Sequence, residues 1–66
     1  MIGYKVYRIG HDGLIEETAF VEAGCDDEII EACIEAQGRA RLEIWSGERF
    51  VALLREPRPA GSQVRH

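Results

Sequence analysis

The sequence has 66 residues, of which 45% are hydrophobic and 30% charged, and its formal net charge is −4. This length allows one small domain, and the composition is too apolar for a chain that stays disordered. A monomer of this size is only marginally stable, so a partner surface would help it. No apolar run reaches the roughly 18 residues of a membrane span and no signal peptide stands at the start, so we expect a cytoplasmic protein without membrane contacts.

The charges are unevenly distributed along the chain. Residues 1–54 hold five basic and eleven acidic side chains, a net charge of −6, whereas residues 55–66 hold three arginines and one glutamate. An acidic body repels phosphate, which disfavours nucleic acid as a partner of the domain. We expect residues 1–55 to form one domain and residues 56–66, with their two prolines and small polar residues, to form a flexible basic tail.

Two segments near the start of the chain predict a β-hairpin. Residues 4–9 are rich in aromatic and β-branched side chains, and residues 10–13 follow with the composition of a turn, an Asp-Gly step included. A second strand from Leu14 or Ile15 to Glu22 has apolar residues on both of its sides, so its alternation leaves the buried side open.

Residues 26–37 are the segment that predicts a helix. Its first three residues are acidic, which suits the positive end of the helix dipole, and Gly38 suits the left-handed turn after a helix. At about 100° per residue, one arc centred near Cys33 is apolar and predicts the buried face. The opposite arc is acidic and holds Glu28, Glu31 and Glu35.

Residues 41–45 and 49–54 predict a second hairpin. A three-residue loop, 46–48, places Ile44 opposite Phe50, apolar against apolar, and a two-residue loop does not, so we expect the longer loop. One face of this hairpin then holds Leu42, Ile44, Phe50, Ala52 and Leu54. The other face holds Glu43, Trp45, Arg49, Val51 and Leu53. Both faces are therefore partly apolar.

The order of these elements predicts an α+β domain of β-β-α-β-β type. A helix that returns the chain along the sheet makes the second and third strands parallel, and the right-handed crossover rule favours the first strand between them. We expect a four-stranded, mainly antiparallel sheet in the order 2-1-3-4 with the helix on one face. The order 1-2-3-4, with one parallel pair, is the alternative.

A single helix leaves the second face of such a sheet uncovered. Side chains of the second hairpin then form an apolar patch, and monomers rarely expose a large one, so we expect a protein interface there. The residues assigned to this interface are Trp45, Arg49, Val51 and Leu53, with Tyr7 or Tyr4 as further candidates. The alternative is that Trp45 is an isolated surface aromatic lying under Arg49.

Candidate catalytic and metal-binding residues are few and lack the required spacing. Cys25 precedes the predicted helix, where backbone amides can stabilise a thiolate, but the acidic residues beside it disfavour a second anion. We expect Cys33 to be a core residue, because it lies in the apolar arc of the helix. We expect His11 and Asp12 to belong to a tight turn. The possible metal ligands are His11, Asp12, Cys25, Cys33 and His66, and no two have a recognised ligand spacing. We expect two free thiols, no metal or cofactor, and no enzymatic activity.

Residues 25–32 and 42–51 together resemble a family of short, uncharacterised bacterial proteins built as β-β-α-β-β. The shared features are an acidic helix start and a hairpin with the pattern Trp-x-Gly-x-Arg-x-Val, here at residues 45–51. The resemblance covers residues 4–54. It supports the architecture, and the family implies no established activity.

The chain also resembles HicB-type antitoxins. The shared features are Tyr4-x-Val6, Asp12-Gly13, Gly24-Cys25 and a helix with Glu31-Ala32. This resemblance implies an inhibitor that binds a basic partner protein, and the surface we assign to that contact is the acidic helix face, Glu28, Glu31 and Glu35.

Three function hypotheses result. The first is a non-enzymatic cytoplasmic interaction module that forms a homodimer through the helix-free face of the sheet. The second is the HicB-like inhibitor of a basic protein. The third is a thiol-dependent enzyme or redox sensor that uses Cys25.

Overall fold

The computed structural model describes residues 1–56, which form four strands and one helix. The elements in chain order are β1 (Ile2–Ile9), β2 (Ile15–Ala23), α1 (Asp26–Ala36), β3 (Arg41–Ser46) and β4 (Arg49–Leu54). The strands pair in one antiparallel sheet in the order β2-β1-β3-β4, so the predicted fold class and strand order are confirmed. The predicted tail lies outside the described residues apart from Glu56.

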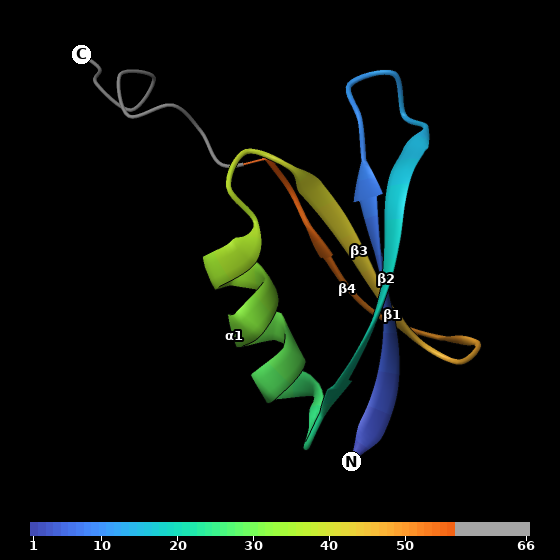
Figure 1. Ribbon diagram of the computed structural model, residues 1–66, viewed down its shortest axis with the longest axis vertical. Coiled ribbons are helices and arrows are strands. Elements are labelled where there is room, and N and C mark those ends of the chain that lie inside the picture. The colour runs from blue at the N-terminus through green and yellow to red at the C-terminus, as the bar shows by residue number, and fades with distance from the viewer. Residues whose placement is uncertain (57–66) are drawn as a thin grey trace.

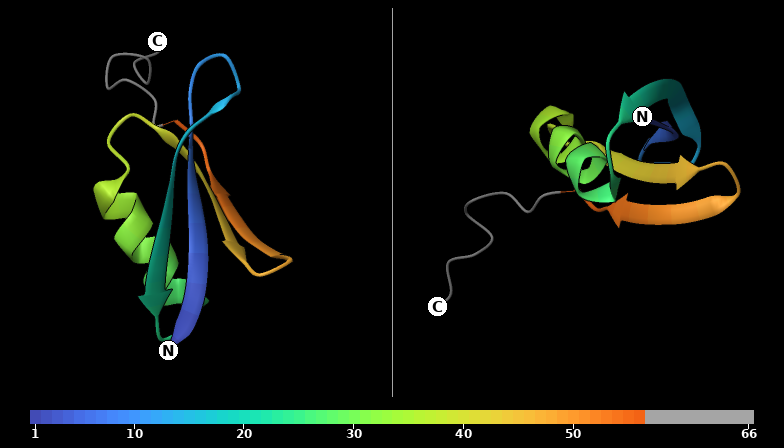
Figure 2. Two further views of the ribbon diagram at one scale, coloured as in Figure 1. Left: turned by 45° about the vertical axis from the view of Figure 1, so that its right-hand side comes forward. Right: turned by 90° about the horizontal axis from the view of Figure 1, so that it is seen from below.

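The domain has two layers, the sheet and the helix. α1 lies on one side of the sheet, and no other helix or strand of residues 1–56 lies on the opposite side (Figure 1). Two further views show the same arrangement, with β2 and β4 at the edges of the sheet (Figure 2). One face of the sheet is therefore free of helix, as predicted.

The hydrophobic core lies between α1 and the sheet. Tyr4, Ile29 and Ile44 are its fully buried large side chains. The other buried members are Val6, Ala23, Cys33 and Leu42. Ile29 and Cys33 are four residues apart on α1, which places them on the same face of the helix. The centre of the predicted apolar arc thus forms the contact with the sheet, whereas Ile34, also predicted in this arc, is 55% exposed.

The last turn of α1 is joined to β3 and to the end of β4 by one buried polar side chain. Gln37, the C-cap residue, is 8% exposed, and its Nε2 donates to the carbonyl oxygens of Ala40 at 2.8 Å and Arg55 at 2.6 Å. These bonds satisfy an amide that would otherwise be costly to bury. Gly38 follows with φ of +60°, the left-handed conformation predicted for it.

The loop of the second hairpin is shorter than predicted. Ser46 pairs with Arg49, so two residues, Gly47 and Glu48, connect β3 to β4. Gly47 has φ of +62°, and the favoured two-residue hairpin turns need positive φ, which glycine adopts without steric cost. The prediction of a three-residue loop, which rests on matching apolar partners, is wrong.

A β-bulge changes which side chains of β4 share a face. Trp45 pairs with Phe50, but Ile44 pairs with Ala52, so Val51 is the extra residue in the ladder. Val51 and Ala52 both pack against the core. Phe50 therefore lies with Trp45 on the helix-free face, and the predicted pairing of Phe50 with Ile44 is wrong.

Candidate interaction surface

The helix-free face of the sheet is lined by aromatic side chains from all four strands. The cross-strand pairing forms one row, made from β2 to β4 by Phe20, Lys5, Trp45 and Phe50. The neighbouring row holds Thr18, Tyr7, Glu43 and Leu53. We call these eight residues the aromatic face.

The large apolar side chains of the aromatic face are open to solvent. Phe20 is 78% exposed, Phe50 is 50% exposed and Leu53 is 40% exposed. Trp45 is half-buried, because its ring packs edge-on against Phe50 with ring centroids 5.3 Å apart and an interplanar angle of 73°. Trp45 and Phe50 are therefore in contact, and Trp45 is not an isolated surface aromatic.

Two charged groups lie among these rings. The Lys5 Nζ atom is 5.8 Å from the ring centroid of Tyr7 and 5.7 Å from that of Phe20, within the range of cation–π attraction. The second charged group is Glu43, whose Oε1 accepts a hydrogen bond from Trp45 Nε1 at 3.0 Å. The aromatic face therefore carries one positive and one negative charge, in contrast to the net charge of −6 over residues 1–54.

Two of the four residues assigned to the interface from the sequence lie elsewhere. Trp45 and Leu53 are on the aromatic face. Val51, however, packs against the core, because the bulge turns it toward the helix side. Arg49 also lies on the helix side, where its guanidinium reaches the start of α1. Trp45 is therefore not covered by Arg49, which was the alternative to an interface.

Sequence reasoning missed Lys5, Phe20 and Phe50 as members of this face. Of the two tyrosine candidates, Tyr7 belongs to it, whereas Tyr4 is buried against α1. The alternation of β1 contains the signal for two of these residues, since a buried Tyr4 places its neighbour Lys5 on the other face, and Phe20 pairs with Lys5. The side of Phe50 depends on the bulge.

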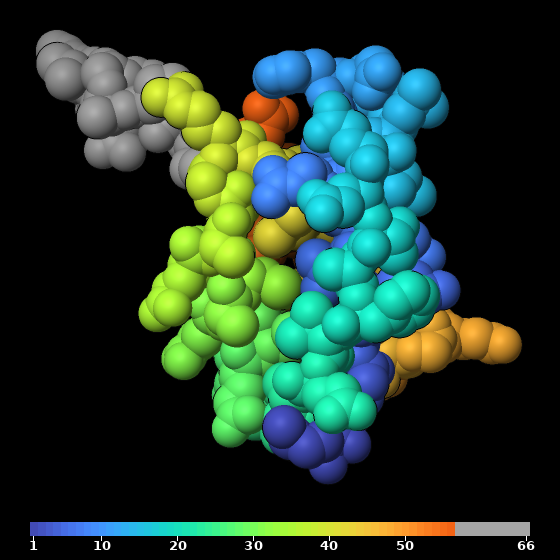
Figure 3. Space-filling model, in the orientation of Figure 1, coloured from blue at the N-terminus to red at the C-terminus, as the bar shows by residue number. Residues whose placement is uncertain are grey.

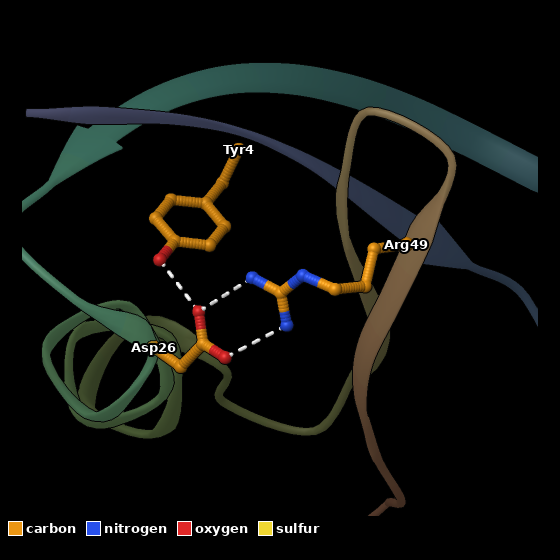
Figure 4. Close-up of polar contacts among 3 residues, drawn as sticks. All are labelled: Tyr4, Asp26 and Arg49. Atoms are coloured by element: carbon orange, nitrogen blue, oxygen red, sulfur yellow. Dashed lines mark hydrogen bonds and ion pairs between the residues drawn. The ribbon is translucent and has the colours of Figure 1, made fainter.

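Arg49 belongs to a polar cluster at the start of α1 (Figure 4). Its Nη1 donates to Asp26 Oδ2 at 2.9 Å and its Nη2 donates to Asp26 Oδ1 at 3.1 Å. The Tyr4 hydroxyl donates to the same Oδ1 at 2.7 Å. A bidentate arginine–carboxylate pair is strongly directional, so this cluster fixes the ends of β1, α1 and β4 against one another.

These contacts shift the pKa values of all three side chains away from neutrality. The hydrogen bonds from Arg49 and then from Tyr4 lower the pKa of Asp26 to about 2. Burial, followed by the hydrogen bond to Asp26, raises the pKa of Tyr4 to about 12. The hydrogen bond to Asp26 also raises the pKa of Arg49. The cluster keeps fixed charges near pH 7 and acts as a structural connection.

The two cysteines and His11 make none of the hydrogen bonds of this cluster. Cys25 is exposed and Cys33 is buried, and both are free thiols. Burial raises the pKa of the Cys33 thiol, which makes it a weak nucleophile. The side chain of His11 is almost fully exposed, with its Nδ1 atom 3.9 Å from Glu56 Oε2. Within residues 1–56 there is no group of three or more cysteine, histidine or acidic side chains placed to hold a metal ion.

The three glutamates of the predicted acidic helix face are all exposed. Glu28 Oε1 accepts a hydrogen bond from the backbone N–H of Gly24 at 2.8 Å, so it stabilises the chain entry into α1. At about 100° per residue the three glutamates lie within about 60° of one another, on the side of α1 opposite the buried Ile29 and Cys33.

Comparison of the chain with protein-family models, with curated proteins and with solved structures finds no match. The two family resemblances therefore stay predictions. Among residues 1–56, α1 is too short to cross a membrane and no other helix is present.

Proposed function

We propose that this protein is a non-enzymatic interaction module of the cytoplasm that forms a homodimer through its aromatic face. The observation that carries the proposal is the row of Phe20, Trp45 and Phe50, which α1 does not cover. Exposed aromatic side chains gathered on one face in this way are uncommon on a monomer and are typical of an interface. Pairing two such faces removes the rings of both copies from water.

The helix-free side of the sheet approaches the size of a stable interface. The eight residues of β1 extend for about 27 Å, and four strands span about 19 Å, which gives a flat footprint of about 500 Å² for the whole side. A standard interface buries about 800 Å² on each partner. Because projecting side chains add to the flat area, a homodimer contact would use the whole helix-free side and not the aromatic face alone.

The charges direct a contact between two copies to the aromatic face. Two chains that each carry −6 over residues 1–54 repel one another over most of their surfaces. The aromatic face is different, because Lys5 and Glu43 balance there. In a two-fold dimer each contact occurs twice, so Lys5 of each copy can pair with Glu43 of the other.

Phe20→Asp tests this proposal. At 78% exposure Phe20 contributes little to the core of one subunit. In the dimer, however, the variant would replace a ring at the contact by a carboxylate, and removing that charge from water is unfavourable even beside Lys5. We expect sedimentation equilibrium at micromolar concentration to give twice the chain mass of 7.4 kDa for the parent and the single chain mass for the variant.

Leu14→Asp is the matched control for this experiment. Leu14 is 66% exposed, but it lies in the loop between β1 and β2 and not on the aromatic face. The control adds the same charge and removes a comparable apolar side chain, so it should sediment as the parent does. A Phe20→Asp protein with the mass distribution of the parent would remove the proposed interface.

A further inference from the structure

We draw no further inference here: the strongest candidate, the apolar groove between α1 and β2 in which atoms of β1 and β3 are visible (Figure 3), carries none, because the charged residues of its lining, Arg8 and Glu17, pair with each other and nothing in the structure shows what covers it.

Discussion

Replacing Ile44 by alanine is expected to lower the free energy of unfolding by roughly 2 to 5 kcal/mol. Ile44 is fully buried at the centre of the core, next to Tyr4 and Ile29. The change removes three carbon atoms and leaves a cavity that the surrounding strands can close only in part. Because a domain of this size has little stability in reserve, a large fraction of the molecules should be unfolded at room temperature.

Urea denaturation at one fixed protein concentration measures this effect, since dimer formation makes stability depend on concentration. Ile15→Ala is the matched control, because Ile15 also lies in a strand but is 55% exposed. It should change the free energy of unfolding by less than about 1 kcal/mol. Equal losses from the two substitutions would show that the core is not centred on Ile44.

Asp26→Asn is expected to remove an acid-sensitive part of the stability. The pKa of Asp26 is about 2 in the folded protein, against an ordinary value of 3.8. A group whose pKa is lowered by folding stabilises the folded state above its unfolded pKa. That contribution is therefore complete above about pH 4 and is lost as the pH falls from 3.8 toward 2. The asparagine variant keeps the shape of the side chain but not the charge that Arg49 binds.

Denaturation midpoints between pH 6 and pH 2 measure this difference, over a window of about four pH units that brackets both pKa values of the carboxyl group. The parent should be clearly more stable than Asp26→Asn near pH 6, and the two midpoints should converge as the pH approaches 2. Asp27→Asn removes an exposed carboxylate from the same turn of α1 and serves as the control. A constant gap between the parent and Asp26→Asn over the whole range would contradict the role of the ionised carboxylate.

The sequence was sufficient for the fold because its strongest signals are local and periodic. The helix is determined by an apolar arc around Ile29 and Cys33, by acidic residues at its start and by Gly38 at its end. The strand order then results from the handedness of the crossover and from the short loops, which leave few other topologies. These features do not depend on contacts between distant parts of the chain.

The residues of the aromatic face were predicted only in part, because a bulge is not visible in a pattern of alternation. One extra residue, Val51, reverses the faces of the residues that precede it in β4. Phe50 thereby joins Trp45, and Arg49 moves to the helix side, where it meets Asp26. Strict alternation assigns Arg49, Phe50 and Val51 to the wrong face.

A groove of about 370 Å³ between α1 and β2 could not be derived from the sequence, since it depends on where α1 lies across the width of the sheet. Ala32 and Ala36 fall in the predicted apolar arc, but periodicity alone places them in a filled core. The structure puts α1 so that these alanines border a gap. In the sequence the two alanines indicate only a good helix propensity. In the structure, their small volume is the reason that the gap is open.

Acrylamide quenching of Trp45 at increasing protein concentration tests the proposed homodimer most directly. Trp45 is the only tryptophan of the chain, and it lies in the middle of the aromatic face. If two copies join through this face, the quenching constant should fall in step with the rise in sedimented mass, and the Phe20→Asp protein should stay fully quenchable. Quenching that does not change while the mass doubles would place the contact elsewhere, and a mass that stays at 7.4 kDa would contradict the dimer itself.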